Sequence, residues 1–467
     1  MDELADLDGL CARLAESPLL REHDVLWLAP TEPAPVDFAA ALAAALAKPV
    51  GTPPLHELAH GRRTAVIVTD DATRATPSAA MIGPVMAELA SGGISPDDVE
   101  VIIAVGTHRP PTPDEMRRLV GDDWSSRVRV TVHDSRADDL VPLGHTPSGT
   151  PLLVNRRVAQ ADLRIAFGQV EPHFFAGFTG GRKAILPGIS SYETIVHNHR
   201  LDNLSAATAR PGVLEGNPVH EDMLAAARLA RLDFIVNVAP DRESRPVAVA
   251  AGDVEQAHVA LVDFLRSQFG VPVPTRPPAM IVTGPGRPLD INLYQTIRAL
   301  VGIEPLLDAH EADAPVVVVL SRCWDGDGSD EMFEPFLSTD EQIEQVEGAT
   351  ESSLPRAQAI SQAALRSLRC DYTTEKDVSY FVARATPKCR ALVACCPGIS
   401  DERLRLFGWE PARDADAAVT RALELDRGRA IAARSGEMAR AGRGSDVHDD
   451  EPRLVVMCPS AQRALFV

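Results

Sequence analysis

The sequence contains no segment that reads as a membrane span or a signal peptide. No run approaches the roughly 18 uninterrupted apolar residues of a span, and the first twenty residues are acidic where a signal peptide is basic. The seven cysteines form no CxxC pair, so zinc or redox motifs of that type are excluded. We expect a folded cytoplasmic protein whose cysteines are mostly reduced and buried.

Positive charge is also scarce. The 46 lysine and arginine residues are outnumbered by 66 aspartate and glutamate residues, and the formal net charge is -20. A field of that sign repels nucleic acid and acidic membrane surfaces, so we expect neither as a partner. An anionic small molecule would need a local basic pocket.

What is present is a pattern of short apolar strands alternating with helical segments, over a length of 467 residues that suits two or three domains. Strands rich in β-branched residues and separated by helices are typical of parallel α/β sheets. We predict two α/β domains with mainly parallel sheets and an active site in the cleft between them. The predicted strands are Thr64 to Thr69, Val99 to Val105, Val128 to Val132, Leu163 to Phe167, Ala279 to Val282, Val316 to Leu320 and Ala391 to Cys396.

A proline-rich stretch at 271–279 marks the predicted domain boundary, because proline at this density ends helices and stiffens a connection. We therefore predict an N-terminal domain over residues 1–275 and a C-terminal domain over 276–440. The last segment, 441–467, contains an apolar run that we expect to form a strand and to pack back on the N-terminal domain.

The residues that follow the first two strands are candidate functional residues, since ligands of such sheets bind beyond the carboxyl ends of the strands. Arg74 follows the first strand and could grip a carboxylate with its two-pronged guanidinium. His108 follows the second and could act as a general base. The structural alternatives are an Asp–Arg pair that holds the loop together and a histidine with no chemical role.

The densest segment is EPHFFAGFTGGRKAILPG at 171–188. Gly180 and Gly181 precede Arg182 and Lys183, and glycine amides beside two cations predict an anion site, although the Walker spacing is absent. Lys183 could also anchor a cofactor covalently. Shortly after, two histidines at 197 and 199 cannot both face one site on a helix, so one is a candidate metal ligand and the other a surface residue.

Taken together, these segments resemble the nickel-dependent lactate racemase family, whose members invert the stereocentre of a 2-hydroxy acid. The strings DDATRATP, GTHRP, EPHFFAGFTGGRKAILPG, HNH and PLDINLYQTIR occur in this order between Thr64 and Asp330. The resemblance implies a nickel-pincer nucleotide, a pyridinium mononucleotide whose two sulfur-bearing arms hold nickel. It also implies partner enzymes that make this cofactor and a small 2-hydroxy acid as the substrate.

The resemblance assigns roles to the candidate residues. Lys183 would hold the cofactor through a thioamide bond, and His199 would be the protein's ligand to nickel. Hydride transfer needs one base for each enantiomer of the substrate, and His108 and His173 match the family's pair. The remaining cofactor contacts would come from Asp71, Gly180, Gly181 and Arg182, of which the last three would seat the nucleotide phosphate.

For the substrate, the resemblance implies that Arg74 binds the carboxylate and that Tyr294, Gln295 and Arg298 of the second domain close over it. Arg298 stands where the family pattern has lysine. Its broader guanidinium fork leaves a bulkier hydroxy acid, a doubly anionic one or a sugar acid as alternatives to lactate.

Two other functions are compatible with the same residues. One is a zinc-dependent hydrolase with His108, His173 and His199 as ligands, which requires three imidazoles within about 2.0–2.1 Å of one ion. The other is a binding protein for a nucleotide or hydroxy acid that performs no turnover.

Overall fold

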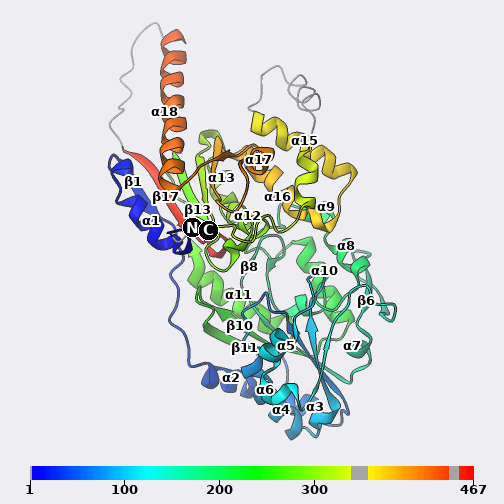
Figure 1. Ribbon diagram of the computed structural model, residues 1–467. Helices are drawn as coiled ribbons and strands as arrows, with labels where there is room; N and C mark the ends of the chain where they lie inside the picture. Colours follow the sequence, from blue (N-terminus) through cyan, green and yellow to red (C-terminus); the bar gives the residue numbers. More distant parts are fainter. Residues whose placement is uncertain (1–2, 338–355, 441–451, 467) are drawn as a thin grey trace. The chain divides into compact units, whose positions relative to one another are not determined.

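The computed structural model describes residues 3–337, 356–440 and 452–466, and the chain divides into two compact units (Figure 1). Unit 1 comprises Met1–Pro30 and Gly270–Val467, and unit 2 comprises Thr31–Phe269. Each unit contains a six-stranded, mainly parallel sheet, so the predicted α/β fold class is confirmed. In the part of the chain that the structure describes, no helix is both long and apolar enough to cross a membrane.

The sheet of unit 2 has the strand order β11-β10-β7-β2-β3-β4. Only β10 and β11 pair antiparallel, and the other neighbours are parallel. The strands are β2 (Ala65–Asp70), β3 (Val99–Ala104), β4 (Arg129–Val132), β7 (Leu163–Gln169), β10 (Phe234–Pro240) and β11 (Pro246–Gly252). Two small hairpins, β5 (Val141–His145) with β6 (Pro151–Val154) and β8 (Pro172–His173) with β9 (Gly177–Phe178), lie outside this sheet.

Helices cover this sheet and close its core. The side chains of Ile67, Val101 and Ile165 on β2, β3 and β7 are fully buried, and they pack with Met81 and Val85 of helix α4. Burial of each large aliphatic side chain contributes about 1.5–3 kcal/mol. The helices of unit 2 are α2 (Phe38–Ala47), α3 (Leu55–Ala59), α4 (Ser78–Ser91), α5 (Pro113–Val120), α6 (Asp122–Ser125), α7 (Arg156–Gln160), α8 (Tyr192–Asn198), α9 (Leu201–Leu204), α10 (Pro218–Leu229) and α11 (Gln256–Phe269).

The sheet of unit 1 is parallel throughout, with the order β1-β17-β13-β14-β15-β16. The seven cysteines are free and six are buried. The strands are β1 (His23–Trp27), β13 (Met280–Gly284), β14 (Val316–Leu320), β15 (Ala391–Cys395), β16 (Glu410–Pro411) and β17 (Arg453–Pro459), with a separate pair β12 (Gly270–Val271) and β18 (Leu465–Phe466). The helices are α1 (Leu7–Ala15), α12 (Leu293–Gly302), α13 (Glu304–Ala309), α15 (Arg356–Cys370), α16 (Asp377–Ala385), α17 (Asp401–Leu406) and α18 (Ala415–Arg440).

The division of the chain differs from the predicted domains 1–275, 276–440 and 441–467 at both ends. Residues 1–30 belong with the C-terminal unit, because the apolar face of α1 packs into its core through Leu7, Leu10 and Leu14. The segment after 452 does form a strand, β17, but this strand lies between β1 and β13 of unit 1 instead of returning to the N-terminal domain. Unit 2 ends at Phe269, just before the proline-rich stretch.

Candidate active site

The candidate site lies at the carboxyl-terminal edge of the unit 2 sheet, in the loops that follow β7, β2 and β3. These three strands are neighbours, and hydrogen bonds join their loops. Gln169 at the end of β7 accepts the N–H of Ala75 at 2.9 Å, and the N–H of Gly106 after β3 donates to the carbonyl of Gly188 at 3.1 Å. The three loops are separate in the sequence, but they therefore lie side by side at one edge of the sheet.

Asp71 and His108 meet across the ends of β2 and β3. His108 Nδ1 lies 2.6 Å from Asp71 Oδ2. A carboxylate can only accept, so Nδ1 carries the hydrogen and the lone pair of the neutral imidazole is on Nε2. Burial raises the pKa of Asp71, but hydrogen bonds from His108 and Thr73 outweigh it and hold the pKa below its usual range. Asp71, predicted as a cofactor contact, thus orients the half-exposed His108 as a proton acceptor.

His173 and Lys183 form the second contact of the site. Lys183 Nζ lies 3.1 Å from His173 Nε2, while the main-chain N–H of Ala176 donates to His173 Nδ1 at 3.2 Å. A lysine ammonium can only donate, so a hydrogen-bond donor faces each ring nitrogen of His173, and the neutral ring accepts at one of them. The imidazole is buried and stacks on the ring of Phe174. His108 is therefore held by a carboxylate, whereas His173 has hydrogen-bond donors at both of its ring nitrogens.

The two glycines before Lys183 are required by packing. Gly180 and Gly181 have positive φ angles of 76° and 53°, and a side chain on Gly181 would meet the ring of His258 at 3.1–3.2 Å. The Gly181 N–H donates to Asn237 Oδ1 at 2.8 Å. The described contacts thus give this turn a structural purpose, and its role at a phosphate stays a prediction.

Arg182 follows the two glycines, and its side chain is fully buried. Its guanidinium donates to main-chain carbonyls of its own loop and contacts His258 Nε2 at 2.8 Å. Burial lowers the pKa of Arg182 to about 9, so it remains a cation at neutral pH. In this conformation the cation organises the loop instead of presenting its charge to a phosphate. The accepting carbonyls are those of Ala176 (2.9 Å), Phe178 (2.8 Å), Thr179 (3.2 Å) and Gly180 (3.2 Å).

We expect the Arg182→Leu variant to lose about 3 kcal/mol of unfolding free energy, because several buried carbonyls would lose their donor at once. Chemical denaturation of the variant and the parent measures the difference. Arg109→Leu, which removes an exposed arginine of the neighbouring loop, is the control and should leave the unfolding midpoint nearly unchanged. An Arg182 variant with parent stability but no bound cofactor would favour the phosphate role instead.

His199 follows α8 as its C-cap residue, and its side chain is buried. Its Nδ1 donates to the carbonyl of Ile195 at 3.1 Å, so the lone pair of the neutral ring is on Nε2. Burial, followed by the charge of Lys183, lowers the pKa of His199 to about 3, and a neutral imidazole is the form that binds a metal. His197 is used differently, since its Nδ1 contacts the hydroxyl of Thr150 at 2.9 Å. His199 thus fits a soft or borderline metal such as nickel.

The predicted substrate residues fall in two places. Arg74 lies in the loop after β2, where its Nη1 contacts the hydroxyl of Thr73 at 3.3 Å. Tyr294, Gln295 and Arg298 lie on α12 in unit 1, and the Tyr294 hydroxyl donates to Asp377 Oδ1 at 3.0 Å. We predicted that Tyr294, Gln295 and Arg298 act on a substrate held by unit 2 and that the site lies in a cleft, and both statements stay predictions.

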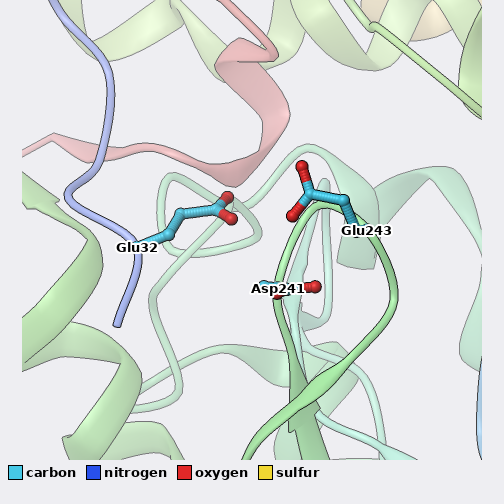
Figure 2. A group of neighbouring side chains, drawn as sticks. All are labelled: Glu32, Asp241 and Glu243. Atoms are coloured by element: carbon cyan, nitrogen blue, oxygen red, sulfur yellow. The ribbon is translucent and has the colours of Figure 1, made fainter. Parts of the chain in front are cut away.

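The zinc alternative does not fit the structure. Among the residues that the structure describes, His108, His173 and His199 do not bring three ring nitrogens within 4.8 Å of one another. The group that does meet this limit is acidic, namely Glu32, Asp241 and Glu243 (Figure 2). Arginines compensate its charge: Arg242 lies 3.4 Å from Glu32, and Arg245 lies 2.7 and 2.8 Å from Asp241 and Glu243. We interpret it as an ion-pair cluster.

Comparisons with known proteins show the family to which the chain belongs. The model of the lactate racemase N-terminal domain matches residues 15–210, and that of the lactate racemase C-terminal domain matches residues 275–368. A lactate racemase of Thermoanaerobacterium thermosaccharolyticum is 39% identical over 294 residues, which are 62% of this chain and 67% of that protein. A lactate racemase of Lactiplantibacillus plantarum is 35% identical over 317 residues, which are 68% of this chain and 73% of that protein.

Solved structures show the same similarity. The lactate racemase apoprotein of T. thermosaccharolyticum superposes with a TM-score of 0.77 and 29% identity, over 97% of this chain and 96% of that one. A Thermotoga maritima protein has the same fold, with a TM-score of 0.57 and 15% identity, over 90% of this chain and all of that one. The site and fold therefore define an α/β isomerase. The chain belongs to the lactate racemase family.

Some residues of the site escaped the sequence analysis. Asn237 lies inside β10 and accepts a hydrogen bond from the turn at Gly181. The signal that could have identified Asn237 is its position as the single polar residue of the apolar string FIVNVAP. His258 on α11 contacts Arg182, and Gln169 ties β7 to the loop after β2, but neither is marked by any local pattern. These residues support the loops that carry Arg74, Lys183 and the two histidines.

Proposed function

We propose that the protein interconverts the enantiomers of lactate or a closely related 2-hydroxy acid, using a nickel-pincer nucleotide attached to Lys183. Family membership supports the racemase reaction. The observation that carries the assignment of residues is the placement of the two histidines: Asp71 orients His108 so that the lone pair of its neutral ring is on Nε2, and His173 lies against Lys183, the proposed attachment point. A racemase must take a proton from one substrate hydroxyl and give one back to the opposite enantiomer.

The residues of this chain fit the proposed cofactor. Lys183 places its amine beside His173 and near the ring of Phe175, with Nζ 5.6 Å from the ring centroid, and would form the covalent attachment. His199 is a neutral, oriented imidazole and would provide the ligand to nickel. When bound, such a cofactor accepts a hydride from the substrate and returns it. Maturation enzymes that make it would be the functional partners.

The side chains then divide the remaining work. Arg74 would bind the carboxylate and fix the substrate's orientation at the sheet edge. His108, held by Asp71, would accept the hydroxyl proton of one enantiomer at Nε2. His173 would accept the hydroxyl proton of the other enantiomer, and in each case the protonated imidazole would return a proton when that enantiomer is formed again. Neither step requires a carbanion at the weakly acidic carbon beside the carboxylate.

The test is racemisation by the protein co-expressed with cofactor-making enzymes, followed by optical rotation. L-lactate and D-lactate should both lose optical activity, and larger or doubly anionic hydroxy acids should report the effect of Arg298. An Arg298→Lys variant, which has the family's residue, is the matched control for specificity. Turnover of a dianionic acid with none of lactate would overturn the lactate assignment, and failure with every acid would overturn the proposal.

A further inference from the structure

A buried carboxylate next to the end of α8 has no role in the reaction described above. Asp222 on α10 is 3% exposed, and among the described residues no lysine or arginine pairs with it. Its two oxygens accept instead from four neutral donors, which suits the lone pairs of an ionised carboxylate. The donors are the hydroxyls of Thr146 (2.5 Å), Ser148 and Thr150 (2.7 Å) and the amide of Asn198 (2.8 Å).

Two of these donors connect Asp222 to the residues directly before His199. Asn198 is fully buried and is the last residue of α8, and its Nδ2 donates to Asp222 Oδ2 and to the carbonyl of Val219. Thr150 contacts both Asp222 and His197 Nδ1. The ring of His199 has its own hydrogen bond to Ile195 one turn back in the same helix. That bond orients the ring relative to α8 but does not fix where α8 ends.

The opposite end of α8 is anchored independently of Asp222. Thr194 in its first turn donates to the carbonyl of Pro151 at 2.6 Å and accepts the N–H of Leu153 at 3.1 Å, so this end is tied to β6. Removal of the Asp222 carboxylate should therefore loosen the C-terminal end of the helix, where Asn198 keeps its bonds to Val219 and Asn203, while the start of the helix stays in place. The imidazole of His199 would be displaced together with that end.

We propose that Asp222 is a positioning residue for the metal ligand: through Asn198 it fixes the end of α8 and so the place of His199 Nε2. The proposal rests on the proposed function, because it takes His199 as the ligand to nickel. Metal–ligand distances tolerate only about ±0.2 Å, and loss of an outer residue that orients a ligand typically weakens metal binding about 10–100-fold.

The test measures nickel release from the loaded enzyme into a chelator, per mole of folded protein. Asp222→Ala should release nickel about tenfold faster than the parent or more, while the intact mass should still show the cofactor on Lys183. Asp241→Ala is the matched control, because it removes another buried carboxylate of unit 2 that is bonded to Arg245 and not to α8. A purely structural effect would lower the melting temperature in both variants and leave nickel release unchanged.

Two further variants keep the test decisive. Asn198→Ala cuts the same link from the other side and should reproduce the faster release, so it carries the test if Asp222→Ala does not fold. One outcome would overturn the role of Asp222 and leave the proposed function standing. In that outcome His199→Ala releases nickel fast, but Asp222→Ala releases it at the parent rate, as does Asn198→Ala if that variant is used in its place. Parent-like release from His199→Ala would instead overturn the nickel ligand, and with it both proposals.

Discussion

The Lys183→Ala variant should fold normally, contain no covalently held cofactor and show no racemisation. The Lys183 side chain is only partly buried, and its contacts include His173 and the ring of Phe175. Its truncation removes no core packing, so the unfolding free energy should change by less than about 1 kcal/mol. Activity depends on the amine as the attachment point, so its loss should be complete.

Intact mass spectrometry after co-expression with the maturation enzymes measures the attachment, and thermal unfolding measures the fold. Lys48→Ala is the control, because Lys48 is an exposed lysine of unit 2 at the end of α2. That variant should retain both the added mass and the activity. A Lys183→Ala protein that keeps the added mass would show that the attachment is elsewhere.

Replacement of either His108 or His173 by alanine should abolish interconversion in both directions, by about 10²–10⁴-fold. Each imidazole serves one enantiomer, and a full cycle needs both. A half reaction should survive, in which one enantiomer still gives an equivalent of keto acid per loaded enzyme. Because each remaining imidazole would accept the hydroxyl proton of one enantiomer only, the two variants should retain opposite enantiomers.

Single-turnover keto acid formation from D- and L-lactate separates these outcomes, and optical rotation reports the full cycle. His60→Ala, at an exposed histidine after α3, is the control and should behave as the parent does. If both single variants racemise at the parent rate, the two-histidine mechanism is wrong. If both retain the same enantiomer, the assignment of one histidine to each enantiomer is wrong.

The sequence predicted most strands of both sheets, because a strand buried on both faces is an almost continuous β-branched run. The strands that were not predicted are β1, β10, β11 and β16. The run predicted at Val99 to Val105 is β3 (Val99–Ala104), and Val316 to Leu320 is β14 without any change. The partners of strands were harder to predict. β1 pairs with β17, with Asp24 opposite Leu454, and no local pattern reports a contact over that separation in the chain.

In the candidate site, too, residues marked by a local sequence pattern could be predicted, and contacts between distant parts of the chain could not. The position after a parallel strand selected Arg74 and His108, and the family resemblance added Asp71. The adjacency of β2 and β3 brings Asp71 and His108 to 2.6 Å. Arg182 was assigned to a phosphate because a cation beside glycines suggests an anion site. Its actual acceptors are carbonyls of the same loop, and only the folded turn shows that they point inward.

The placement of β17 has a consequence for synthesis on the ribosome. Unit 2 is one continuous stretch, Thr31–Phe269, so all of its strands and the Lys183 loop have emerged before most of unit 1 is made. Unit 1 cannot complete its sheet until Arg453–Pro459 emerges and inserts between β1, made at the start, and β13, made midway. Residues 1–30 therefore wait for β17, the strand that pairs with β1, throughout the synthesis of unit 2. Unit 2, which carries Lys183, is complete first.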